Sequence, residues 1–203
     1  MSAELAVLQA IRLKGRGDAA AAAVCVGVDE STAAGILADL AERGLVKGGP
    51  AFRITPEGRE HLTAALAAER AEVDLTALKA AYADFDQVNS ELKAIVTAWQ
   101  MRDPETPNDH TDAAYDATVI ERLGGVDVAF TPVLEQVIAA APRLHPYRLR
   151  FANALQRIHA ADTAFVARPL IDSYHTVWFE FHEELIGLLG LSRADEAAAG
   201  RAL

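Results

Sequence analysis

Cysteine, lysine and long apolar runs are scarce in this chain of 203 residues. The single cysteine, Cys25, excludes a disulfide framework and a thiolate metal cluster within one chain. No apolar run approaches the roughly 18 residues that cross a bilayer. The N-terminal residues also lack the basic and then apolar layout of a signal peptide. We therefore expect a cytoplasmic protein that has no membrane partner.

Motifs that mark common enzyme chemistries are absent as well. The sequence contains no G-x-G-x-x-G, no Walker loop and no H-E-x-x-H. Ser173 and His175 fall close together, but a serine and a histidine on one helix make no catalytic triad without the right geometry. We assign no catalytic residue, expect no cofactor, and favour a non-enzymatic function.

Charge is distributed unevenly along the chain, whose net charge is −10. Residues 1–65 carry 7 Lys and Arg against 8 Asp and Glu, a net of −1, whereas residues 66–203 carry 12 against 21, a net of −9. Because phosphate affinity comes mainly from lysine and arginine, the charge of the first part is less unfavourable for DNA binding than that of the second. With 51% hydrophobic residues, the chain has enough apolar side chains for a proper core.

The first 65 residues predict three helices followed by a hairpin. Apolar residues at helical spacing indicate helices over residues 4–13, 19–24 and 31–43, with Asp18 as the cap of the second and Asp29 or Glu30 opening the third. Short strands over residues 45–47 and 51–54 flank a Gly-Gly-Pro turn. Thr55 and Pro56 then have the residue types of a helix cap and a first helical position. This is the order of a winged helix-turn-helix, which we place at 1–65.

Residues 31–62 resemble the recognition helix and wing of MarR-type and related winged-helix transcription regulators. The resemblance rests on the Ser31-Thr32 start, Leu40, the exit Arg43-Gly44-Leu45-Val46 and the wing closure Ile54-Thr55-Pro56-Glu57-Gly58. These residues are about a sixth of the chain, and the winged helix at 1–65 to which they belong is about a third. It implies that the third helix enters the major groove of double-stranded DNA.

The outward face of that helix departs from the family pattern. The positions expected to face outward are Ser31, Thr32, Ala34, Gly35, Ala38 and Asp39. None is Arg, Lys, Asn or Gln, so no bidentate base contact is available. The DNA contacts that we expect are Ser31, Thr32, Arg12, Lys14, Arg16, Lys47 and Arg53. The alternative is a winged helix used for dimerisation or for protein contact.

The remaining residues, 66–203, predict an antiparallel α-helical bundle for dimerisation and effector binding. Helical patterns cover residues 56–71, 75–101, 112–140, 147–161 and 168–189, with a proline-rich break at 103–107. Gly124-Gly125 and Pro132 predict a kink or a split in the third of these helices. In the last helix, Glu180, Glu183 and Glu184 are expected to form a solvated face.

Two stretches of this part, residues 108–116 and 172–184, concentrate its polar and aromatic residues, and three interpretations stay open. In the first they are helix caps and core aromatics, since a stripe at spacings of 3 and 4 is typical of a bundle core. In the second an effector pocket is lined by Trp99, His110, Tyr115, Tyr174, His175 and Trp178. In the third a metal is held by His110, Asp112, Asp116, Asp172 and His175.

These patterns favour a mainly α, two-domain DNA-binding transcription regulator. We expect a homodimer whose partners are double-stranded DNA and a small-molecule effector. The alternative is an enzyme or ligand-binding protein that keeps the winged helix as a scaffold. A protein–protein adaptor is a third hypothesis, supported only by the acidic C-terminal part.

Overall fold

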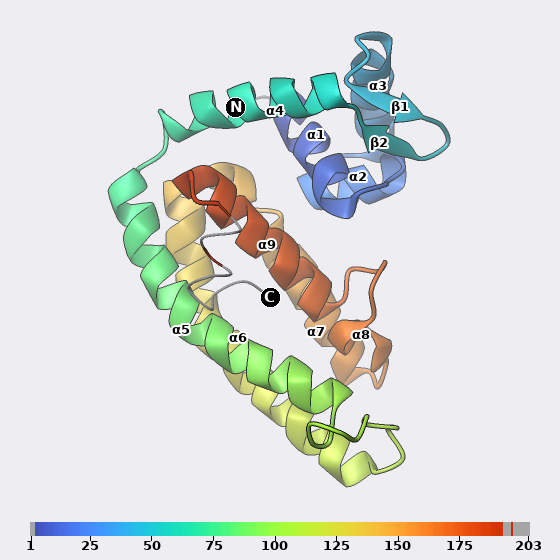
Figure 1. The fold of residues 1–203 in the computed structure, drawn as a ribbon, viewed down its shortest axis with the longest axis vertical. Helices are drawn as coiled ribbons and strands as arrows, with labels where there is room; N and C mark the ends of the chain where they lie inside the picture. Colours follow the sequence, from blue (N-terminus) through green and yellow to red (C-terminus); the bar gives the residue numbers. More distant parts are fainter. Residues whose placement is uncertain (1–2, 193–195, 197–203) are drawn as a thin grey trace.

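The computed structural model describes residues 3–192 and residue 196. The fold is mainly helical, with one two-stranded antiparallel sheet among the described residues (Figure 1). The N-terminal unit consists of α1 (Ala3–Lys14), α2 (Ala19–Val26), α3 (Glu30–Glu42), β1 (Val46–Gly48), β2 (Phe52–Ile54) and α4 (Pro56–Arg70). The C-terminal helices are α5 (Leu75–Gln100), α6 (Ala113–Ala140), α7 (Tyr147–His159), α8 (Ala164–Ala167) and α9 (Tyr174–Leu189), with a 3-10 turn at Pro142–Leu144.

Short-range polar contacts set the helix starts in the N-terminal unit. Asp18, Asp29 and Thr55 each accept a hydrogen bond from a backbone N–H in the first turn of α2, α3 and α4, respectively. Each satisfies one of the donors that a helix N-terminus leaves unpaired. The caps expected at positions 18 and 55 are confirmed, and Asp29 rather than Glu30 caps the third helix.

The hairpin is attached to the α1–α2 loop through β2. Its register pairs Val46 with Ile54, Lys47 with Arg53 and Gly48 with Phe52. Phe52 also exchanges two backbone hydrogen bonds with Gly17, of 3.1 and 2.7 Å, which attach β2 to the loop between α1 and α2.

Gly58, in the first turn of α4, permits a close approach of that helix to the residue before β1. A Cβ atom at this position would lie 1.9 Å from the carbonyl oxygen of Leu45. Glycine is therefore required here for steric reasons rather than for its backbone freedom.

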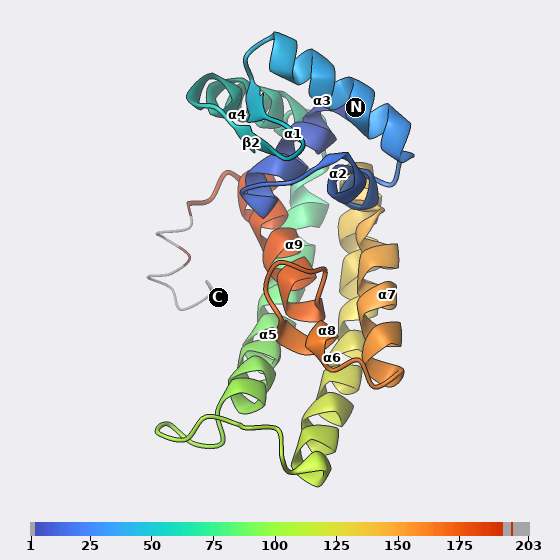
Figure 2. The ribbon, with the colours of Figure 1, turned by 90° about the vertical axis from the view of Figure 1, so that its right-hand side faces the viewer.

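The C-terminal helices surround a separate aromatic core. Figures 1 and 2 show α5 and α6 as a long antiparallel pair, with α7 and α9 packed beside it. Among the buried rings that contact one another are those of Phe85, Phe130, Phe151, Trp178 and Phe181. A second hydrophobic cluster fills the N-terminal unit. Helix α4 runs through residue 65, so the domain boundary there stays a prediction.

Two expectations about the long helices are corrected. Helix α6 is continuous through Gly124-Gly125 and Pro132, so it is not split there, while the expected kink stays a prediction. Pro132 is exposed and has no N–H, so the carbonyl group of Val128, one turn earlier, has no donor within the helix. Val128 is 75% exposed, so water can donate to this carbonyl group instead. The last helix starts at Tyr174 rather than at 168, because Ser173 caps it.

The N-terminal unit rests on the C-terminal helices through two clusters of buried charge. The Arg143 cluster joins Arg143 to Glu184 and Glu69, both at 2.8 Å, and Gln9 of α1 donates to Glu184 at 3.1 Å. The Arg150 cluster consists of Lys14, Arg150, Asp172 and Glu180.

These clusters correct the expectation of a solvated acidic face on the last helix. Glu180 and Glu184 are only 2% and 4% exposed. Glu183 is half-buried and lies 3.5 Å from Arg12. The acids of α9 face the N-terminal unit, so the polar side of this helix is an internal contact surface.

Helix α6 is long and apolar enough, by length and composition, to cross a membrane, and α2 with α3 pass the same test if the bent pair is taken together. Eight side chains of α6 are buried in the structure. Core helices of soluble proteins meet the same criterion.

Candidate functional site

The outward face of α3 is exposed at every position where the sequence predicts it. Ser31, Thr32, Ala34, Gly35, Ala38 and Asp39 are all accessible to solvent. The two hydroxyl groups at its start already donate to the Asp29 carboxylate, with the Thr32 Oγ1 to Oδ2 distance at 2.7 Å. The hydrogen bond from Ser31 and those from Thr32 hold the pKa of Asp29 well below its usual range.

Asp39, the acid on this face, is partly compensated. Its carboxylate lies 3.0 Å from the Arg43 guanidinium, which also contacts Glu4 at 2.8 Å. The negative charge of Asp39, which would repel DNA phosphates, is therefore partly neutralised by a cation one helical turn away.

Three of the predicted DNA-contact cations are exposed. Arg16, Lys47 and Arg53 make no ion pair with any residue that the structure describes. Lys47 and Arg53 are directly opposite one another in the hairpin register. Two like charges in this position repel one another, and a bound anion would relieve the repulsion.

The other two predicted cations, Arg12 and Lys14, face the C-terminal helices instead. Lys14 lies 2.7 Å from Asp172 and 3.0 Å from Glu180. Burial opposes the charge on Lys14, but its interactions with Cys25, Glu180 and Asp172 outweigh burial and raise the pKa of the ammonium group. Lys14 is thus engaged in the Arg150 cluster and is not among the DNA contacts proposed below.

The six predicted pocket residues do not line one cavity. Tyr174 and Trp178 are fully buried. The Trp178 indole donates to Asn89 at 2.9 Å, and the Tyr174 hydroxyl donates to Asp127 at 3.0 Å. Both polar tips are satisfied inside the fold, so these two aromatics belong to the core.

Trp99, His110 and Tyr115 meet at a different place, the loop between α5 and α6. The His110 ring lies 4.4 Å from the Trp99 ring, and the Tyr115 hydroxyl donates to the carbonyl oxygen of Ala98 at 3.0 Å. His110 Nδ1 is 3.0 Å from Asp116. These contacts fasten the long loop to the ends of both helices.

The predicted metal ligands are likewise separated. His110 and Asp116 are paired at the α5–α6 loop, Asp172 lies in the Arg150 cluster, and Asp112 lies 3.3 Å from Arg102. Within residues 3–192 and 196, no three His, Cys, Asp or Glu side chains converge as a metal centre requires.

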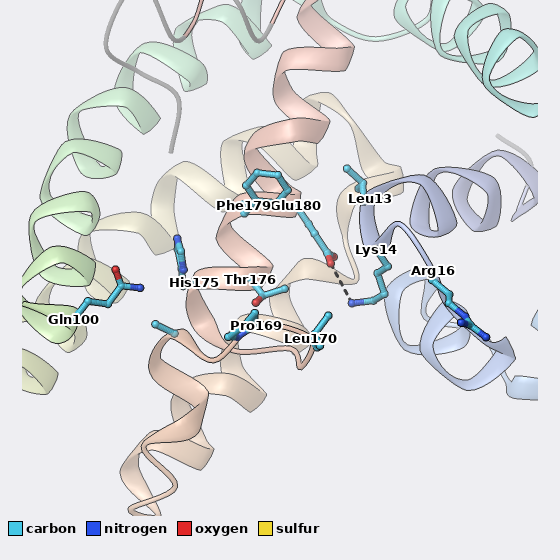
Figure 3. A pocket seen from close by; sticks show the side chains of 11 residues that line it. Leu13, Lys14, Arg16, Gln100, Pro169, Leu170, His175, Thr176, Phe179 and Glu180 are labelled. Carbon is cyan, nitrogen blue, oxygen red and sulfur yellow. Dashed lines mark hydrogen bonds and ion pairs between the residues drawn. The ribbon is translucent and has the colours of Figure 1, made fainter. Parts of the chain in front are cut away.

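His175 is the predicted pocket residue that lines a substantial cavity. This cavity, of about 470 Å³, lies where α1, α5 and α9 meet, and Figure 3 shows the side chains around it. We call it the junction cavity. Its lining residues are Leu13, Lys14, Arg16, Gln100, Ala167, Pro169, Leu170, His175, Thr176, Phe179 and Glu180. Burial lowers the pKa of His175, so its imidazole is neutral at pH 7.

The sequence reasoning missed most of this lining. Gln100 ends α5, and Pro169 and Leu170 lie in the loop before α9, which was expected to be helical. A signal was present, because Ser173 has the residue type of a helix cap and would have ended the loop there.

Comparisons with family models, with curated proteins and with solved structures give no match to this chain.

Proposed function

We propose that the N-terminal unit is a winged helix that binds double-stranded DNA, and that the chain is a transcription regulator. One observation carries the proposal. The C-terminal helices pack against α1, α2 and α4, while the outward face of α3 stays uncovered (Figure 2). A winged helix kept only as a scaffold for the rest of this chain has no need to leave that face free.

Phosphate contacts dominate the proposed interface. Arg16, Lys47 and Arg53 are the exposed cations of the α1–α2 loop and the wing, and they supply affinity without base recognition. Ser31 and Thr32 give their hydroxyl protons to Asp29, so on DNA their oxygens accept from cytosine or adenine amino groups. Direct base recognition by α3 is therefore sparse.

The regulator that we propose is a homodimer formed through the C-terminal helices. Two winged helices bind adjacent half-sites when their recognition helices lie about 34–36 Å apart, one turn of DNA. A small-molecule effector that prefers one arrangement of the C-terminal helices then changes this spacing.

Substitutions in the wing test the proposal. We expect the double variant Lys47→Ala/Arg53→Ala to bind duplex DNA about tenfold more weakly at physiological salt, because it loses two phosphate contacts per protomer. Fluorescence anisotropy with a labelled duplex measures the affinity, and circular dichroism checks the fold.

The matched control removes the same charge elsewhere. Lys79→Ala/Arg122→Ala takes two exposed cations from α5 and α6, far from the wing. Equal affinities for the two double variants would refute the assigned DNA face.

A ligand-binding protein or an enzyme with a scaffold winged helix is the second candidate. It is favoured by the junction cavity and by the pairing of Lys14 with carboxylates. Wild-type protein that binds no duplex even at low salt, yet binds a small molecule, would favour this candidate.

A further inference from the structure

The junction cavity has apolar walls and polar ends. Its apolar lining residues are Leu13, Ala167, Pro169, Leu170 and Phe179. Lys14 and Glu180 also line it, but they lie 3.0 Å apart as an ion pair and compensate one another. Figure 3 shows Gln100 and His175 at one end, with Lys14 and then Arg16 on the opposite side.

The polar groups at the ends of the cavity make no hydrogen bond or ion pair through their side chains with the residues that the structure describes. They are the Gln100 amide and the His175 imidazole at one end and, beyond Lys14 at the other, the Arg16 guanidinium, whose side chain points outward in Figure 3. Gln100 and neutral His175 each offer a donor and an acceptor. Arg16 offers a fixed fork of N–H donors that matches a carboxylate. A few placed polar groups around an apolar hollow are the composition of a small-molecule site.

The size of the cavity limits the ligand. One water molecule, with its single non-hydrogen atom, takes up roughly 30 Å³ in the liquid. At that volume per non-hydrogen atom, a cavity of about 470 Å³ holds about fifteen such atoms. The walls are mainly aliphatic, and a second cavity shares Lys14, Arg16 and Leu170 with the first. This elongated layout fits a flexible chain better than a compact ring.

Leu170 marks the surface that a ligand would cover. Its side chain is 99% exposed, although it is large and apolar, and it lines both cavities. Its φ angle is +68°, which is uncommon for a residue with a bulky side chain. An apolar chain bound beside Leu170 would remove this side chain from water.

We propose that the junction cavity binds a medium-chain aliphatic carboxylate with a hydroxyl or carbonyl group at its far end, the carboxylate contacting Arg16. The chain lies against Leu13, Leu170 and Phe179, and Gln100 with His175 binds the distal polar group. The proposal of this binding site depends only on the properties of the cavity. Its regulatory consequence rests on the proposed DNA binding: a ligand carboxylate and a DNA phosphate compete for Arg16, so the ligand weakens DNA binding.

Isothermal titration calorimetry of the full chain, without DNA, tests the site. The probes are 10-hydroxydecanoate and decanoate, both below their critical micelle concentrations, and 1,10-decanediol below its solubility limit. We expect 10-hydroxydecanoate to bind most tightly, decanoate about threefold more weakly because a neutral hydrogen bond is lost, and the uncharged diol at least about tenfold more weakly.

Two variants and one control identify the residues that bind each end of the ligand. Arg16→Ala should weaken both carboxylates about tenfold and leave the diol unchanged. Gln100→Leu should reduce the preference for the hydroxylated chain, with His175 left as the other partner of the distal group. Arg168→Ala removes the same charge from the neighbouring loop, outside the cavity lining, and should change nothing. No binding of any probe, or equal carboxylate affinity in wild type and Arg16→Ala, would overturn the site.

DNA anisotropy with and without 10-hydroxydecanoate tests the coupling separately. A reduced duplex affinity in wild type, and no reduction in Arg16→Ala, supports competition for this guanidinium. Duplex affinity that is unchanged by saturating ligand overturns the coupling and leaves the site intact. Failure of DNA binding alone counts against the proposed function, whereas failure of the calorimetry alone counts against the ligand site.

Discussion

At the scale of single residues, the buried charges between the two parts of the chain are the most consequential feature. Glu184 contacts Arg143, and Glu180 contacts Arg150 and Lys14, all with little exposure to water. Removing one partner of a buried pair leaves the other charge buried and unpaired, which lowers the free energy of unfolding by several kcal/mol. The sequence shows only a polar stripe on the last helix, because the partners come from elements as far away as α1.

Asp172 allows a test of this charge network. Burial opposes its ionisation, but Arg150 and Lys14 outweigh burial and lower the pKa of the carboxyl to about 2 from an ordinary 3.8. A lowered folded-state pKa contributes stability that is present above about pH 4 and is lost as the pH falls toward 2.

Asp172→Asn should therefore lower the free energy of unfolding by about 2 kcal/mol at pH 7. The variant should also lose less stability than wild type between pH 4 and 2. Urea unfolding at several pH values measures both, with Asp84→Asn as an exposed control. A variant whose stability parallels that of wild type across this range would contradict the assigned pairing.

Residue types alone predicted part of the candidate site. His175 lines the junction cavity, which is not the pocket expected between the C-terminal helices, and Tyr174 and Trp178 are core residues. Their polar tips find Asp127 and Asn89, which are distant in sequence. A stripe of aromatics at helical spacing cannot reveal whether such partners exist.

At the scale of elements, local signals predicted the helices well. Caps, apolar spacing and turn glycines act over a few residues, so the starts of α2 and α4 and the positions of the hairpin strands followed from the sequence. The start of α9 and the continuity of α6 did not, because a helical pattern extends to both sides of the Ser173 cap and because the proline in α6 faces solvent.

Gly58 tests the packing of α4 against the residue before the hairpin. We expect Gly58→Ala to destabilise the protein by about 3 kcal/mol, because the added methyl group would meet the Leu45 carbonyl oxygen. Gly35→Ala on exposed α3 meets nothing within 4 Å and should stabilise by up to about 1 kcal/mol. Thermal unfolding measures both changes. Equal effects in the two variants would rule out the close approach.

At the scale of the whole molecule, two hydrophobic clusters are joined through buried charge. This junction holds α1, and with it Arg16, against the loop before α9. The proposed winged helix and the proposed ligand site therefore share a structural element. The sequence predicted two parts but no junction, since contacts between them depend on the tertiary arrangement.

The salt dependence of duplex binding tests the central claim most directly. Three exposed cations per protomer, Arg16, Lys47 and Arg53, predict that log K falls with log salt concentration at a slope of about −5 for a dimer, at about −0.9 per phosphate neutralised. The measurement is fluorescence anisotropy from low to physiological salt, with a duplex from upstream of the protein's own gene and a scrambled duplex. A steep slope with preference for the upstream duplex agrees with a DNA-binding regulator. A slope near zero, or no binding at the lowest salt, would contradict it.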